Sequence, residues 1–102
     1  MNKVKLLSLA EKGLDEICQY LSQFYPGTPG RFLDALETIF DNLRVNPKMY
    51  PVFEYNNEYR RFVIDDFLGF YITDEKDKLV RIYRILYGKR SITTILDKLQ
   101  AQ

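Results

Sequence analysis

The sequence contains no histidine, no tryptophan and only one cysteine, Cys18. Histidine is the usual general base and metal ligand of proteins, and a structural zinc site needs several Cys or His ligands. We therefore expect no metal and no cofactor. A single cysteine cannot form an internal disulfide, and it is typical of a cytoplasmic protein with a buried thiol. Any catalysis would have to use Arg, Lys, Tyr, Asp or Glu side chains.

Long apolar runs are also absent. None approaches the ~20 residues of a membrane span, and the N-terminus lacks a signal-peptide layout. The 102 residues are 46% hydrophobic and 28% charged. This composition predicts one folded domain over residues 1–102, with one core and no contact with a membrane.

The charge is unevenly distributed. Residues 1–58 carry 6 Lys or Arg against 8 Asp or Glu, a net charge of −2, whereas residues 59–102 carry 9 against 6, a net charge of +3. The excess in the second part is modest, below that of a protein that coats nucleic acid.

The first part of the chain predicts a strand and a helix. The apolar run Val4–Ser8 is long enough for one strand. Ser8 and Glu11 have the spacing of a capping box, in which the Ser8 hydroxyl would accept from the Glu11 amide. A helix should then cover about residues 9–25 and stop at Pro26–Gly27. Its apolar stripe, at spacings of three and four, is Leu14, Ile17, Cys18, Leu21 and Phe24.

A second helix should follow directly. Thr28 is a suitable N-cap, Pro29 is suited to the first helical position, and the helix should end near Val45, before Asn46–Pro47. Its stripe is Phe32, Leu33, Leu36, Ile39, Phe40 and Leu43. Two helices joined by so few residues must lie antiparallel. After them, residues 47–57 form a connector that we expect to lie against the body of the protein.

Residues 59–91 are rich in β-branched and aromatic side chains and predict a sheet. Strands are expected at 59–64, 67–73 and 79–87, with turns at Asp65–Asp66 and at 74–77. Gly88 can take a positive φ at the exit of the sheet. Ser91 should cap a short final helix. The fold class is thus α+β: an N-terminal strand, a helical hairpin and a short C-terminal helix around a curved antiparallel sheet of about four strands.

The third of these strands alternates imperfectly. Val80, Ile82 and Leu86 would share one face, with Arg81, Tyr83 and Tyr87 opposite. Arg84 and Ile85 are then each on the wrong face. Either a β-bulge between Tyr83 and Leu86 corrects the pattern, or Arg84 has a carboxylate partner.

Cations gather in this sheet region and suggest a binding face, with the two helices burying the other face. The residues are Arg60, Arg61, Arg81, Arg84, Lys89 and Arg90, interleaved with Tyr59, Tyr71, Tyr83 and Tyr87. Guanidinium groups bind carboxylate or phosphate by paired hydrogen bonds, and tyrosines offer stacking faces. The alternative is that these charges only solvate the sheet and pair with Asp65, Asp66, Asp74 and Asp77.

Other candidate motifs are weaker. Asp65 and Asp66 are adjacent in an extended chain, so they point to opposite faces and suit a turn better than shared acid–base work. The segment Gly88–Arg90 has no phosphate-loop context.

Several motifs, in order, resemble the RelE/ParE superfamily of toxins from bacterial type II toxin–antitoxin modules. They are Ala10-x-x-x-Leu14-x-x-Ile17-x-x-Tyr20, Arg31-Phe32, Leu43-x-x-x-Pro47-x-x-Tyr50-Pro51, Tyr59-Arg60-Arg61 and the run from Val80 to Arg90. The resemblance covers nearly the whole chain. It implies the fold given above and a cognate antitoxin protein as a partner.

Two activities are known in this superfamily. RelE-like members cut messenger RNA on the ribosome, whereas ParE-like members block DNA gyrase. The long helical hairpin and the Pro47-x-x-Tyr50-Pro51 segment resemble the ParE branch. The RelE pattern would put basic residues where this chain has Phe62 and Phe67, and a late Tyr or His where residues 92–102 have none. Only Arg60 and Arg90 match it.

The resemblance therefore implies a ParE-like toxin with DNA gyrase as its target. Its target- or antitoxin-binding residues would be Arg60, Arg61, Arg81, Arg84, Tyr87, Lys89 and Arg90. Tyr87 departs from the many relatives that have histidine there. Two alternatives stay open: a ribosome-dependent mRNA endonuclease using Arg60, Arg81, Arg90 and Tyr87, and an inactive binding module on the same fold.

Overall fold

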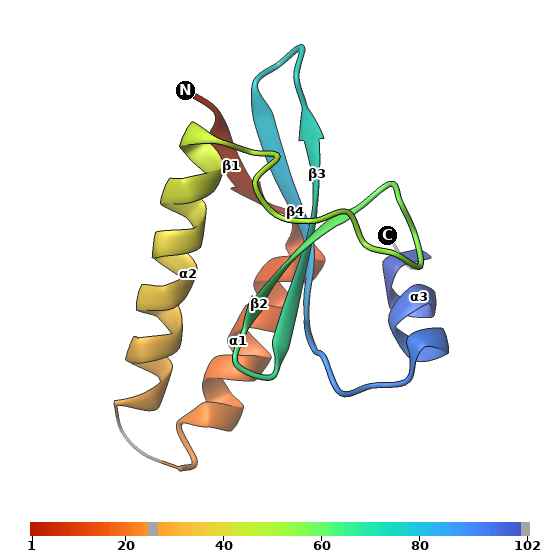
Figure 1. The fold of residues 1–102 in the computed structure, drawn as a ribbon. Helices are drawn as coiled ribbons and strands as arrows, with labels where there is room; N and C mark the ends of the chain where they lie inside the picture. Colours follow the sequence, from red (N-terminus) through yellow and green to blue (C-terminus); the bar gives the residue numbers. More distant parts are fainter. Residues whose placement is uncertain (25–26, 101–102) are drawn as a thin grey trace.

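The computed structural model describes residues 1–24 and 27–100. The elements are β1 (Lys3–Leu6), α1 (Ser8–Leu21), α2 (Thr28–Val45), β2 (Arg60–Ile64), β3 (Phe67–Asp74), β4 (Leu79–Tyr87) and α3 (Ile92–Gln100). The α1–α2 hairpin lies on one side of the sheet and α3 on the other (Figure 1). The predicted α+β fold and the predicted order of its elements are confirmed. In the described residues, no helix is long and apolar enough to cross a membrane.

The sheet has the strand order β1-β4-β3-β2. The pairs β2–β3 and β3–β4 are antiparallel, as predicted. The edge strand β1 instead pairs parallel with β4, from Lys3 opposite Leu79 to Leu6 opposite Ile82, so the sheet is mixed. The partner of β1 is far along the chain, where no local sequence pattern could indicate the direction of pairing.

Both helix starts differ from the prediction. Leu7, not Ser8, is the N-cap of α1, and no side chain caps the helix, so the predicted capping box does not form. The Leu7 N–H donates to the Ile82 carbonyl at 3.0 Å, and its own carbonyl accepts from the Glu11 N–H at 3.0 Å. Pairing with β4 therefore fixes where α1 begins. Gly27 is likewise the N-cap of α2 in place of Thr28, so Pro29, predicted at the first helical position, is the second residue of the helix.

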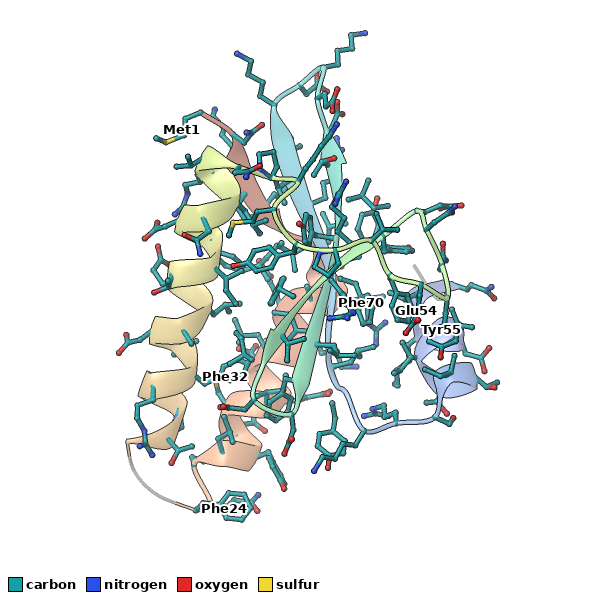
Figure 2. The ribbon with its side chains drawn as sticks, in the orientation of Figure 1. Met1, Phe24, Phe32, Glu54, Tyr55 and Phe70 are labelled. Carbon is teal, nitrogen blue, oxygen red and sulfur yellow. The ribbon has the colours of Figure 1, made fainter. Side chains whose placement is uncertain are left out.

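The end of α1 also differs from the prediction. The helix ends at Leu21, and the Phe24 side chain is 57% exposed, so Phe24 does not extend the buried stripe. Phe24 lies at the far end of the hairpin, next to Tyr20 (Figure 2). Tyr25 and Pro26, where the helix was expected to stop, are outside the described residues. Cys18 is only partly buried, and this burial raises the pKa of its thiol.

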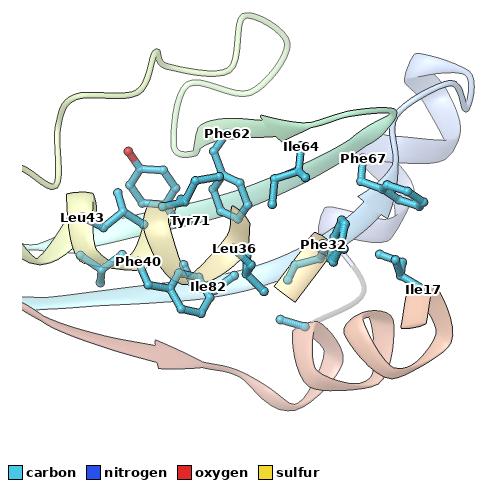
Figure 3. Close-up of a cluster of buried hydrophobic side chains, with 14 residues drawn as sticks. Ile17, Phe32, Leu36, Phe40, Leu43, Phe62, Ile64, Phe67, Tyr71 and Ile82 are labelled. Carbon is cyan, nitrogen blue, oxygen red and sulfur yellow. The ribbon is translucent and has the colours of Figure 1, made fainter. Parts of the chain in front are cut away.

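The main core lies between the helical hairpin and the sheet (Figure 3). Phe32 of α2 packs edge-to-face on Phe67 of β3, with ring centroids 5.3 Å apart. Tyr71 is fully buried, and its hydroxyl donates to the Pro47 carbonyl at 2.8 Å. Large apolar side chains buried in this way each contribute roughly 1.5–3 kcal/mol. The other labelled members are Ile17, Leu36, Phe40, Leu43, Phe62, Ile64 and Ile82.

A second core covers the opposite face of the sheet. Phe70 of β3 is fully buried there, edge-to-face against Phe53 of the connector at 4.8 Å between centroids. The other buried members are Tyr59, Leu86, Ile95 and Leu99. The centre of this face was expected to be presented to a partner, and that expectation is wrong. The connector and α3 occupy it, so the connector packs against the body as predicted.

A β-bulge in β4 explains the imperfect alternation. Phe70 pairs with Arg84 and Tyr71 pairs with Ile82, which leaves Tyr83 as the extra residue. Ile85 therefore joins Ile82 in the main core, and Leu86 joins Tyr83 in the second core. The prediction of a bulge is confirmed at Tyr83, while the placement of Leu86 with Val80 and Ile82 is wrong.

Gly88 is required by close packing, and not by the positive φ that was expected for it. None of the glycines in the described residues has a positive φ. A Cβ on Gly88 would lie 2.9 Å from Leu68 Cγ and 3.0 Å from the Asp66 carbonyl oxygen. The Gly88 N–H donates to that same carbonyl at 2.7 Å. Close packing of the exit of β4 on the β2–β3 turn therefore requires glycine.

Candidate functional site

A groove of about 490 Å³ lies where α1, the end of β4 and α3 meet. It follows the edge of β4 beyond Ile82, where β1 has ended and α1 takes its place. Ile17, Phe67 and Ile85 give it apolar walls, and Tyr20 and Tyr87 line it as well. Four cations surround it, against the single carboxylate of Glu16: Lys12, Arg84, Arg90 and Lys98. The groove thus combines an apolar surface with positive charge.

The bulge at Tyr83 puts Arg84 opposite Phe70 in the sheet, and Arg84 also lines the groove. Its Nε atom is buried and has no hydrogen-bond acceptor among the described residues. Burial lowers the pKa of the Arg84 guanidinium; the carboxylate of Glu16 opposes this, and the charge of Arg90 adds to it. The predicted alternative of a carboxylate partner is not met by any ion pair within 4.0 Å in the described part of the chain.

Of the other predicted site residues, Tyr87 and Arg90 also line the groove. Tyr87 is 40% exposed, and its ring packs edge-to-face on Phe67 at 5.9 Å between centroids. Lys89 points elsewhere, to the β2–β3 turn, with its Nζ 3.5 Å from Asp66 Oδ1. Asp66 and Asp65 form that turn, in the role predicted for them, and Asp65 has φ 51°.

Arg60 and Arg61 lie on opposite faces of β2. Arg60 pairs with Tyr71 on the face of the helical hairpin, whereas Arg61 pairs with Phe70 on the other face. Arg60 Nη1 donates to the Tyr50 carbonyl at 2.8 Å and to the Lys48 carbonyl at 3.2 Å. It therefore holds the connector, and it does not converge with the groove.

Arg81 is also separate from the groove. It pairs with Ile72 in the sheet, whereas Tyr87 pairs with Phe67, five residues away along β3, or about 17 Å. Its Nη1 lies 3.3 Å from Asp74 Oδ2. The pKa of Asp74 is held below its usual range by the Asp77 N–H and by Arg81. For Arg81 and Lys89, the alternative of pairing with the chain's own aspartates is thus realised.

Sequence reasoning missed the helical side of the groove. Lys12, Glu16 and Tyr20 of α1 and Lys98 of α3 line it. Their spacing of four in α1 does place Lys12, Glu16 and Tyr20 on one helix face. That signal alone could not distinguish a groove wall from a solvated surface. In the described residues, no cluster of His, Cys, Asp or Glu is arranged to hold a metal ion.

Comparison with protein-family models gives a match over residues 4–92, to the ParE toxin of the type II toxin–antitoxin system parDE. This match spans most of the chain. The chain belongs to the ParE toxin family. It is therefore a toxin of the type II toxin–antitoxin class with a RelE/ParE fold. Comparison with curated protein sequences gives no match.

Solved structures agree with the family in their fold. The toxin–antitoxin complex RelBE2 from Mycobacterium tuberculosis is similar with a TM-score of 0.62 and 17% identity, over 84% of this chain and 96% of the other. The chromosomal ParDE system from P. aeruginosa is similar with a TM-score of 0.62 and 19% identity, over 87% and 98%. At such identities the likeness concerns the fold of this ParE-family chain and leaves its target open.

Proposed function

We propose that this ParE-family toxin inhibits DNA gyrase and is neutralised by a cognate antitoxin. The observation that carries the choice of target is the burial of Phe62 and Phe67, which are 1% and 7% exposed in the main core. In the RelE pattern these positions would be basic. Here they support the helical hairpin and cannot bind a phosphate.

The separation of the remaining candidates supports the same choice. A ribonuclease would need Arg60, Arg81, Arg90 and Tyr87 to surround one phosphate, because transition-state charge is stabilised only by donors within hydrogen-bond distance. Arg60 is bound to connector carbonyls, and Arg81 is paired with Asp74. Only Tyr87 and Arg90 share the groove.

The decisive test compares three readouts for the same protein. Purified toxin is added to gyrase in a supercoiling assay, and cells that express it are analysed for the DNA-damage response and, by primer extension, for cuts in translated messages. We expect loss of supercoiling, induction of the damage response and intact messages. Discrete cuts at ribosome-bound codons with unaffected gyrase would instead identify an mRNA endonuclease.

That nuclease is the second candidate because Tyr87 and Arg90, together with Arg84, do line one groove. An inactive binding module is the remaining outcome, and expression without the neighbouring antitoxin gene would then leave growth unaffected. Rescue of growth by co-expression of the adjacent small reading frame is expected for a toxin of either activity.

A further inference from the structure

The groove between α1, β4 and α3 carries an excess of positive charge. Four cations line it and one carboxylate, Glu16, opposes them. Like charges confined around a low-dielectric cavity raise its positive potential, so the groove favours an anionic occupant. Its walls are apolar as well, which favours a side chain carried on a hydrophobic polypeptide segment over a free ion.

One donor in the groove defines where the negative charge would bind. The Arg84 Nε–H is buried without an acceptor in the described part of the chain, and a buried donor is costly until it is paired. Arg84 pairs with Phe70 in the sheet register, and its side chain is half-buried along the groove. A carboxylate can accept from Nε and Nη of one guanidinium at the same time.

We propose that the groove binds an amphipathic segment of the antitoxin, with one carboxylate of that segment bound to Arg84. Apolar residues flanking the carboxylate then pack between Tyr20 and Tyr87, at the two sides of the groove. This inference rests on the proposed neutralisation by an antitoxin, and it selects Arg84 among the seven candidate residues. Arg60, Arg81 and Lys89 already have partners within the chain.

The test uses Arg84→Met, which keeps an unbranched side chain as far as the ε position and removes the charge and the donors. The matched control is Arg81→Met, also on β4, where Asp74 already pairs with the guanidinium. The probe is the polypeptide encoded by the reading frame adjacent to the toxin gene, and its Kd is measured by calorimetry. Loss of one partner of a buried charge pair raises Kd by roughly 30-fold or more. We expect this for Arg84→Met and less than about 3-fold for Arg81→Met.

A double-mutant cycle identifies the carboxylate. Each Asp or Glu of the antitoxin is changed to Asn or Gln, and the toxin variants are titrated against each. One acidic position should be strongly coupled to Arg84 and uncoupled from Arg81. Equal effects of the two toxin variants, or no coupled acidic position, would overturn the proposal. Thermal unfolding confirms that Arg84→Met is folded, and Arg84→Lys, which keeps the charge without the Nε–H, should bind with intermediate affinity.

The results of this test distinguish a failure of the proposed antitoxin-binding groove from a failure of the proposed gyrase inhibition. An antitoxin that binds normally to Arg84→Met would eliminate this subsite and leave gyrase inhibition standing. Loss of gyrase inhibition by Arg84→Met, with antitoxin affinity unchanged, would assign the groove to the target and also contradict the proposal. A toxin without effect on gyrase would refute the proposed target but not a coupled Arg84–carboxylate pair.

Discussion

Gly13 of α1 lies directly against the backbone of Ile85 in β4. A Cβ on Gly13 would be 2.6 Å from the Ile85 carbonyl oxygen. This contact brings α1 onto the edge of β4 just beyond the point where β1 ends, and so forms one wall of the groove. Glycine in the middle of a helix costs about 1 kcal/mol by propensity. Here that cost is offset by a close approach of helix and strand.

Gly13→Ala should therefore destabilise the protein, although helix propensity alone predicts the opposite. The added methyl group meets a backbone oxygen that cannot move independently, so we expect a loss of about 1–2 kcal/mol in the free energy of unfolding. The control is Gly30→Ala in α2, where a Cβ would meet nothing within 4 Å. That variant should be unchanged or more stable by up to about 1 kcal/mol. Urea denaturation measures both, and a stabilised Gly13→Ala would contradict the packing of α1 on β4.

The raised pKa of the buried Tyr71 hydroxyl leads us to expect a loss of stability in alkaline solution. Burial raises the pKa of Tyr71 to about 12 in the folded protein, partly opposed by Arg60, whereas the unfolded chain titrates near its ordinary value of 10.0. Between these pH values the unfolded state releases a proton that the folded state retains. The free energy of unfolding should thus fall by up to about 1.4 kcal/mol per pH unit between pH 10 and pH 12.

The matched variant is Tyr71→Phe. It should lose about 1–2 kcal/mol at pH 7, because the Pro47 carbonyl loses its donor, but its stability should fall less steeply from pH 10 to 12. Some alkaline loss should remain, since burial also raises the pKa of Tyr59. An identical alkaline slope in Tyr71→Phe, measured by urea unfolding across this range, would show that Tyr71 is not the titrating group.

Arg60→Ala should loosen the connector. The two carbonyls of Lys48 and Tyr50 lose their charged donor, and we expect a loss of about 1–3 kcal/mol together with faster proteolysis within residues 47–57. Arg61→Ala, on the neighbouring residue but the opposite face, should change stability by less than about 0.5 kcal/mol. Equal proteolysis rates for the two variants would remove the structural role assigned to Arg60.

Helix α3 should contribute to stability through its buried face. Ile95 is 1% exposed in the second core, so Ile95→Ala should cost about 2–4 kcal/mol. Ile92 is 38% exposed at the start of the same helix, and Ile92→Ala should cost less than about 1 kcal/mol. Thermal unfolding of the two variants distinguishes a packed helix from one that merely follows the sheet, for which both changes would be small.

The sequence alone was sufficient for most of the elements, because apolar spacing in α1 and α2 and β-branched density in β4 are local signals. The sequence did not predict the features that depend on contacts between segments far apart in the chain. The start of α1 depends on the hydrogen bond from Leu7 to Ile82, which overrides the capping box that Ser8 and Glu11 suggest.

The site was less predictable than the fold. The sequence prediction put Arg60 and Arg61 in one binding face because they are adjacent. Strand alternation instead places them on opposite faces of β2. The bulge at Tyr83 then set the direction of Arg84, and the sequence could indicate only that some irregularity was needed there. Lys98 of α3 reaches the groove through tertiary packing, for which the sequence carries no local signal.

The pairing of Lys3 with Leu79 has a consequence for synthesis of the protein. Strand β1 leaves the ribosome before β4, and it has no neighbouring strand until β4 has been synthesised. Contacts so distant along the chain carry a large loop-closure entropy cost, which slows their formation. The nascent polypeptide therefore cannot complete its sheet until translation has passed β4, so a truncated product lacks both the finished fold and the groove that depends on it.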